Sequence, residues 1–116
     1  MRKIEEQMNQ ALRSFSNWSS GNTTVTSTKE EMRVHLHGNH IATLNKATME
    51  LNLFDGGWQS NTTKSRLNAF LDEVAYGVSV FQKNWQWFLH DRRTTATIDF
   101  YDNMVVFSKP LTLSDV

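Results

Sequence analysis

Three histidines cluster in the stretch HLHGNH, where their side chains could bind a divalent metal. Gly38-Asn39 is a two-residue hairpin signal, with glycine supplying the positive φ of a type II′ turn. Such a turn would place His37 directly opposite His40, with His35 one pleat further along the same face. Three imidazoles on one face could hold zinc or another divalent ion, although no acidic residue is adjacent to complete the site. The alternative is a polar hairpin with solvated histidines.

A second set of candidate residues lies in the stretch NTTKSR, at the expected start of a helix. The first N–H groups of a helix lack partners within it and attract anions. Thr62 or Thr63 would be the N-cap, and hydroxyls and cations would complete a cradle for phosphate or carboxylate. The predicted ligand-binding residues are Trp58, Thr62, Thr63, Lys64, Ser65 and Arg66, joined by the basic pair Arg92 and Arg93.

The charges of this helix oppose its dipole, since Lys64 and Arg66 come early and Asp72 and Glu73 come late. Each misplaced charge costs about 0.3–1 kcal/mol at low salt, and a bound anion would offset that cost. The alternative is that both cations pair with a neighbouring acidic loop. If the cations serve only a ligand, replacing both with glutamate should stabilise the fold while weakening binding.

The elements expected to position these residues form an α+β fold, with two helices packed on a mainly antiparallel sheet built from hairpins. Apolar residues at helical spacing predict one helix over 2–16 and another over 63–76. We expect one domain over 1–116, composed of an N-terminal helix and loop (1–22), a β-meander (23–57), a helical segment (58–77), β-hairpins (78–109) and a tail (110–116).

Strand signals fill the remainder of the chain. The β-branched run Thr23–Thr28 predicts a strand with an exposed edge, and two later hairpins are predicted to turn at Lys83-Asn84 and Asp102-Asn103. The first of these hairpins would return Trp85 and Trp87 to one face, where we expect both indoles in the core. Trp58, beside a polar loop, fits the core and the surface equally well.

Composition narrows the function classes. The 116-residue chain has no cysteine, and its 12 basic residues balance its 12 acidic residues. Thiol chemistry is therefore excluded, and neither a broad nucleic-acid-coating surface nor an acidic DNA mimic is favoured. No apolar run has the length of a membrane span, so we expect a cytoplasmic protein without a membrane partner. Without a P-loop, G-x-S-x-G or G-x-G-x-x-G motif, we lean away from an enzyme and expect no cofactor.

The segments MRKIEEQM, WSSGNTTV, VHLHGNHIA and GGWQSNTTKSRLNAFL resemble small accessory proteins of tailed bacteriophages, including T7-like phages. The resemblance runs from Met1 to about Phe107. That group has no assigned activity, so the resemblance implies a setting, the cytoplasm of an infected cell, and no catalytic residues. By analogy, a small phage protein without a catalytic motif is a binding protein.

Three hypotheses for function follow. The first is a non-enzymatic phage-type protein whose Thr62–Arg66 corner binds a host or defence protein, a nucleotide or a nucleic-acid phosphate. The second is a small metal-dependent hydrolase or nuclease that uses His35, His37 and His40. The third is a homo-oligomeric structural module that pairs through the strand edge at Thr23–Thr28.

Overall fold

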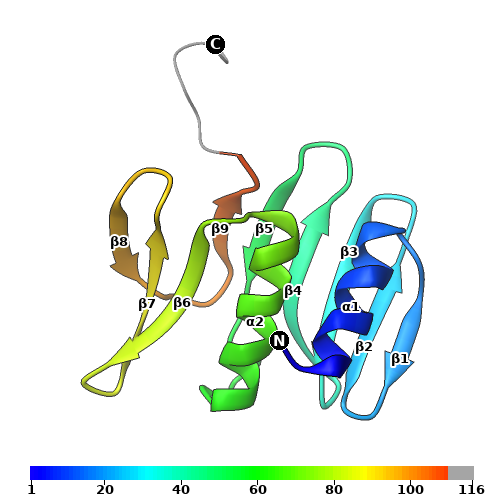
Figure 1. Cartoon of the computed structure of the whole chain (residues 1–116), viewed down its shortest axis with the longest axis horizontal. Coiled ribbons are helices and arrows are strands. Elements are labelled where there is room, and N and C mark those ends of the chain that lie inside the picture. Colours follow the sequence, from blue (N-terminus) through cyan, green and yellow to red (C-terminus); the bar gives the residue numbers. More distant parts are fainter. Residues whose placement is uncertain (110–116) are drawn as a thin grey trace.

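The computed structural model describes residues 1–109, which form two helices and nine strands (Figure 1). The helices are α1 (Lys3–Arg13) and α2 (Asn61–Val74). The strands are β1 (Trp18–Ser20), β2 (Thr23–Ser27), β3 (Glu31–Leu36), β4 (Asn39–Asn45), β5 (Glu50–Leu53), β6 (Val78–Lys83), β7 (Gln86–Asp91), β8 (Ala96–Asp99) and β9 (Met104–Phe107). The predicted α+β class is confirmed, and the predicted tail at 110–116 lies outside the described residues.

A six-stranded antiparallel sheet in the order β1-β2-β3-β4-β5-β9 carries both helices on one face (Figure 1). Strand residues alternate between this covered face and the open face, as the period of a β-strand requires. The core on the covered face includes Met8, Leu12, Val25, Met32, Val34, Leu44, Leu51, Leu53, Leu67, Phe70, Leu71 and Met104. Burial of these side chains fixes the positions of α1 and α2 on the sheet.

A second sheet, with the order β6-β7-β8, stands beside α2. Its inner face buries Val80, Trp87 and Leu89, and its opposite face is open. The Asn68 side chain on α2 accepts a hydrogen bond from the Val80 N–H (2.7 Å) and donates one to the Val80 carbonyl (3.0 Å). Because these are bonds that another strand would make, α2 caps the β6 edge against further pairing.

Two of the strand predictions are wrong. β2 pairs with β1 on one side and β3 on the other, so Thr23–Thr28 is not an edge, and the outermost strand is the three-residue β1. Asp102-Asn103 does not close a hairpin, because β8 pairs with β7 whereas β9 pairs with β5. The carboxylate of Asp102 accepts the Asp55 N–H at 3.0 Å, which draws this connection across to the larger sheet.

The two hairpin tips lie one residue away from their predicted positions. The β3–β4 loop is His37-Gly38 and the β6–β7 loop is Asn84-Trp85, and all four residues have positive φ. Positive φ at both loop positions is the property of type I′ turns, whose twist matches that of the flanking strands. As a result His37 stands at a tip, and Trp85 is 90% exposed while Trp87 is 2% exposed. The predicted core position is confirmed for Trp87 and wrong for Trp85.

Candidate functional site

Helix α2 begins at Asn61, two residues earlier than predicted, and its N-cap is Ser60. The Ser60 hydroxyl accepts the Thr63 N–H at 3.1 Å, which supplies one of the partners that a helix start lacks. Thr63 is 4% exposed, and its hydroxyl donates to the Trp58 carbonyl at 3.3 Å. The predicted N-cap at Thr62 or Thr63 is therefore wrong, and Thr63 serves the local turn.

Arg66 is buried between the two helices and β2, with 3% of its surface exposed. Its guanidinium pairs with the Glu5 carboxylate at 2.8 Å and donates to the Thr23 hydroxyl at 2.9 Å. The Ser65 hydroxyl also donates to Glu5, at 2.6 Å. Glu5 thus occupies the place of the anion that the sequence predicted for Ser65 and Arg66.

The Glu5–Arg66 pair determines how this corner responds to substitution. Burial raises the pKa of Glu5, but hydrogen bonds from Ser65 and Arg66 outweigh it and leave the pKa below its ordinary value. Removing one partner of a buried ion pair strands the other charge and costs about 3–5 kcal/mol. The expectation that glutamate at both cations stabilises the fold is therefore wrong for Arg66.

At the predicted start of the site, Trp58 is exposed, whereas Thr62 and Lys64 are half-buried. Trp58 is 74% exposed, and the Lys64 ammonium donates to the Gln82 side chain of β6 at 3.4 Å. Lys64 also lines an open depression of about 440 Å³ together with the carboxylates of Glu5 and Asp72. These carboxylates disfavour an anion in the depression, whereas the Gln82 contact ties Lys64 to the β6–β7 hairpin.

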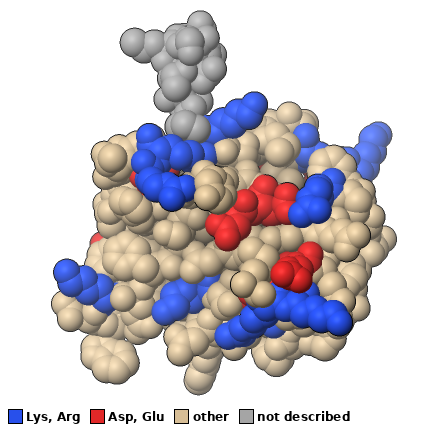
Figure 2. All heavy atoms as spheres, viewed as in Figure 1, with Lys and Arg blue, Asp and Glu red and all other residues tan. Residues whose placement is uncertain are grey.

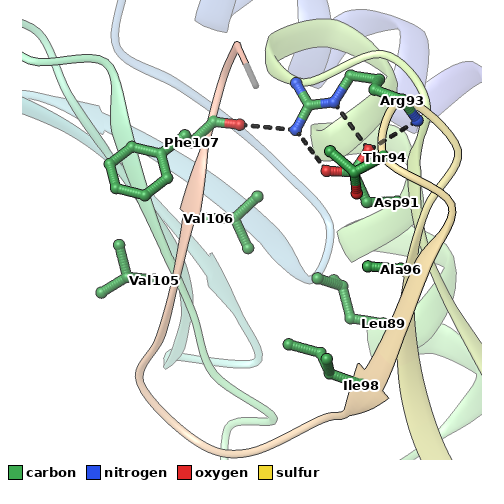
Figure 3. A pocket seen from close by; sticks show the side chains of 9 residues that line it. All are labelled: Leu89, Asp91, Arg93, Thr94, Ala96, Ile98, Val105, Val106 and Phe107. Atoms are coloured by element: carbon green, nitrogen blue, oxygen red, sulfur yellow. Dashed lines mark hydrogen bonds and ion pairs between the residues drawn. The ribbon is translucent and has the colours of Figure 1, made fainter. Parts of the chain in front are cut away.

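Arg92 and Arg93, the predicted basic pair, lie in different environments. Arg92 is exposed and lies over the Tyr76 ring, 5.1 Å from its centroid. Arg93 pairs with Asp91 at 2.9 Å and donates to the carbonyls of Ser108 (2.6 Å) and Phe107 (2.9 Å), as Figure 3 shows in part. The Arg93 guanidinium lowers the pKa of Asp91. Arg93 therefore links β9 to the small sheet. Among residues 1–109, neither arginine forms a hydrogen bond or ion pair with the Thr62–Arg66 corner.

A cleft of about 320 Å³ separates the small sheet from β9 (Figure 3). Its walls are mainly aliphatic, with Leu89, Ala96 and Ile98 on one side and Val105–Phe107 on the other. The polar end is closed by the Asp91–Arg93 pair, whose groups already bond to each other and to β9. The cleft therefore offers mainly apolar packing, and the two charged groups that line it are already engaged within the protein.

The histidines do not form the arrangement predicted from HLHGNH. His35, not His37, is the cross-strand partner of His40, and their rings stack at 5.1 Å between centroids. His40 also packs on Phe54, and its Nε2 lies 3.1 Å from the Ala42 carbonyl. Within residues 1–109, no group of three or more His, Cys, Asp or Glu side chains could hold a metal ion. The geometry invoked for a metal-dependent hydrolase is therefore wrong.

The β6–β7 tip is the surface feature that the sequence prediction missed. Trp85 stands at the tip in solvent, next to Lys83, which is also exposed. On the same hairpin, Phe81 and Phe88 stack with their ring centroids 5.3 Å apart. The relevant sequence signal is that the two residues Asn-Trp, in place of Asn-Gly, occupy a type I′ loop.

Fold and surface together define a small α+β protein with exposed aromatic residues around one hairpin. The family model described as Kyanoviridae Gp96 protein matches residues 1–107, and the chain belongs to this family. The match confirms the prediction of a bacteriophage protein. The family belongs to cyanophages, so the T7-like part of the predicted resemblance is not shown. No curated protein and no solved structure matches the chain. Neither described helix is long and apolar enough to cross a membrane.

Proposed function

We propose that this phage protein is a non-enzymatic accessory protein that binds an anionic host or defence target in the cytoplasm of the infected cell. Its binding surface comprises the β6–β7 hairpin tip with Lys83 and Trp85, and the residues Trp58 and Lys64 at the start of α2. Ser65 and Arg66 hold the start of α2 against α1 through their bonds to Glu5. We refer to Trp58, Lys64, Lys83 and Trp85 as the aromatic corner.

The observation that carries the proposal is the conformation of Trp85. Its φ is 68°, in the left-handed region that costs a non-glycine residue about 1–2 kcal/mol. The indole recovers little of this through packing, because 90% of the residue is exposed. A bulky side chain that strains the backbone without entering the core does not serve the fold. Strain of this kind, once observed, supports a functional role.

The composition of the aromatic corner fits a binding surface for an anion-bearing partner. Trp is enriched among the residues that dominate binding energy, because it contributes a large rigid area. Trp58 and Trp85 expose 74% and 90% of their surface. Lys64 and Lys83 supply positive charge, and the contact from Lys64 to Gln82 joins the α2 start to the hairpin. These features support a partner that presents both planar or apolar groups and negative charge.

Affinity capture from a lysate of a cyanobacterial host tests the proposal. Three tagged proteins are compared, namely wild type, Trp85→Gly and Phe15→Gly, with bound protein and bound nucleic acid both scored. Phe15 is a matched control because it is also an exposed aromatic residue with positive φ (53°), but it follows α1 and lies outside the aromatic corner. We expect Trp85→Gly to lose at least about 90% of the specifically captured material, about 1.4 kcal/mol or more of binding, and Phe15→Gly to keep it. Equal capture by all three proteins would contradict the proposal.

A further inference from the structure

The outer face of the small sheet displays an aromatic pair, in which Phe81 is exposed and Phe88 is half-buried. We use the term outer strip for the residues of β6 and β7 that point away from the core, which are Ser79, Phe81, Lys83, Gln86, Phe88 and His90. Phe81 and Phe88 are direct cross-strand partners whose ring planes are inclined by only 22°. Their neighbours Val80 and Leu89 face the other way and are buried. The core is therefore completed without the Phe81–Phe88 pair.

Cationic side chains stand at both ends of this pair. Lys83 lies towards the tip that bears Trp85. At the other end, the Arg92 N–H donates to the Gly77 carbonyl at 2.9 Å, which continues the ladder beyond β7. The Arg92 guanidinium lies over Tyr76, itself 70% exposed. Figure 2 shows Lys and Arg groups at the two ends of the part of this face over β6–β8, with mostly uncharged surface between them.

The strip is continuous along the hairpin. Ser79 and His90 are cross-strand partners next to the phenylalanine pair, and they line a shallow depression of about 200 Å³ together with Tyr76 and Arg92. Asp72 contributes a carboxylate to the rim of this depression. Asp99 of β8 is the cross-strand partner of Phe88. Between Lys83 and Arg92, the strip residues of β6 and β7 include no acidic side chain.

We propose that the outer strip binds single-stranded nucleic acid, with bases stacked on Phe81, Phe88 and Trp85 and phosphates paired with Lys83 and Arg92. This rests on the proposed function, because Lys83 and Trp85 belong to the aromatic corner, and it names the class of partner. Aromatic rings aligned with cations along a groove or face are the usual elements of single-strand binding. The six residue steps from Gln86 to Arg92 span about 20 Å, which suits a site of about four nucleotides.

The arrangement favours a single strand over a duplex. Stacking on an aromatic ring requires a base face that is free, and the base faces of a duplex are covered by their neighbours. Two or three cations also give only modest attraction to a phosphate backbone. The chain has zero net formal charge, so it lacks the broad basic surface typical of duplex binding. Stacking must therefore supply a large share of the affinity.

Fluorescence anisotropy with labelled dT12 and rU12, alongside a labelled 12-base-pair duplex, tests this proposal on the full chain. Both single strands should bind, and the duplex should bind at least about tenfold more weakly, a difference of about 1.4 kcal/mol. Phe81→Ala should weaken single-strand binding about 5- to 140-fold, the equivalent of 1–3 kcal/mol for one stacked base. Ile98→Ala is the matched control, because Ile98 is 47% exposed on the opposite face of the same sheet and should leave affinity unchanged.

A second variant keeps the test informative if Phe81→Ala is poorly folded. Lys83→Gln alters an exposed charge, and should reduce the slope of log affinity against log salt by about 0.7, the share of one phosphate contact. Lys29→Gln changes an exposed lysine beyond the end of β2 and should not alter the slope. Circular dichroism and the melting temperature establish that each variant is folded before binding is compared.

Three results would overturn the proposal: no single-strand binding at tens of micromolar protein, equal affinity for the duplex, or equal losses from Phe81→Ala and Ile98→Ala. The proposed function fails separately. If lysate capture depends on Trp85 but survives nuclease treatment, and the oligonucleotides do not bind, then the partner is a protein and only the nucleic-acid inference is lost. If the oligonucleotides bind through Phe81 while Trp85→Gly leaves lysate capture unchanged, the proposal for the outer strip is kept and the proposal for the aromatic corner is lost.

Discussion

The hairpin tips of β3–β4 and β6–β7 have the same backbone and opposite side-chain chemistry. Each has a two-residue loop with positive φ at both positions, 51° and 78° for His37-Gly38 and 50° and 68° for Asn84-Trp85. The first loop places glycine where the left-handed conformation carries no steric cost. The second places tryptophan there. The first tip belongs to the middle of the larger sheet, between β2 and β5, while the second projects from the smaller sheet.

The two tips differ in whether the residue with positive φ is one that the turn prefers. The β3–β4 tip follows the residue preference of its turn, so nothing beyond folding is needed to explain Gly38. The β6–β7 tip departs from that preference and places the departing side chain in solvent. Locally inconsistent residues are expected at functional sites, where another demand competes with stability. Trp85 and the outer strip beside it are therefore the parts of this hairpin that folding alone does not explain.

The largest expected effect distinguishes the two tryptophans of one hairpin. Trp87 is 2% exposed and packs edge-on against Phe100, with 5.4 Å between ring centroids. Trp87→Ala should destabilise the protein by about 3–5 kcal/mol through the cavity it leaves. Trp85→Ala should change stability by less than about 0.5 kcal/mol, because it deletes a side chain that is in solvent. Chemical denaturation measures both, and similar losses would show that the tip is part of the core.

Transplanting the tryptophan to the other tip should have the next largest effect. A Cβ at Gly38 would meet no atom within 4 Å, so Gly38→Trp adds backbone strain without a clash. We expect a loss of about 1–2 kcal/mol, the cost of a left-handed non-glycine residue. In a domain of this size each kcal/mol lowers the melting temperature by about 4 °C. An unchanged melting temperature would indicate that positive φ is not costly in these loops.

The reciprocal change, Trp85→Gly, should raise stability. Relief of backbone strain is partly offset by the greater freedom of glycine in the unfolded chain, so we expect a gain of about 0.5–1.5 kcal/mol. Thermal unfolding by circular dichroism gives the sign directly. A gain in stability combined with loss of the bound partner is the pattern of a residue retained for function. A drop in melting temperature would mean that Trp85 has a structural role instead.

The sequence predicted both hairpins but placed both turns one residue away. Moving a two-residue loop by one position shifts the strand pairing by two residues, which leaves every side chain on its original face. Val80 therefore faces the core whether its partner is Trp87 or, as observed, Leu89. The alternation of apolar residues is the same before and after this shift. The fold class and the inner faces could therefore be predicted from the sequence, whereas the residue at each hairpin tip could not.

The partner of Arg66 was not predictable from the sequence, for a different reason. The partner of Arg66 is Glu5, 61 positions away, and no local pattern connects them. A charge placed against the helix dipole signals a nearby opposite charge, and the sequence alone cannot distinguish a ligand from the protein's own carboxylate. The same holds for one partner of Arg93, the Phe107 carbonyl 14 positions away, which meets the guanidinium only after β9 joins the larger sheet. Long-range pairing is the information that the sequence pattern lacks.

The smallest expected effect is a pH dependence that belongs to the β3–β4 hairpin. Burial, with the neighbouring charge of His35, lowers the pKa of His40 below its ordinary value of 6.5. As the pH falls below about 6.5 the unfolded chain takes up this proton before the folded protein does, so stability decreases. Glu5 and Asp91 also have lowered pKa values, but carboxylates whose ordinary pKa values are 4.5 and 3.8 titrate at lower pH. The window from pH 7.5 to 5.5 therefore separates the effect of His40 from the effects of these carboxylates.

His40→Gln should reduce the loss of stability between pH 7.5 and 5.5, since glutamine keeps a polar side chain that does not titrate. His37→Gln is the matched control, because His37 is exposed at the tip of the same hairpin and should leave the loss intact. Urea denaturation at each pH measures the free energy of unfolding. If wild type and His40→Gln lose the same stability on acidification, the pH sensitivity lies elsewhere, and the β3–β4 hairpin does not differ from the β6–β7 hairpin in this respect. If only His40→Gln is insensitive, the pH dependence of stability belongs to His40, which packs on Phe54 beside the β3–β4 hairpin.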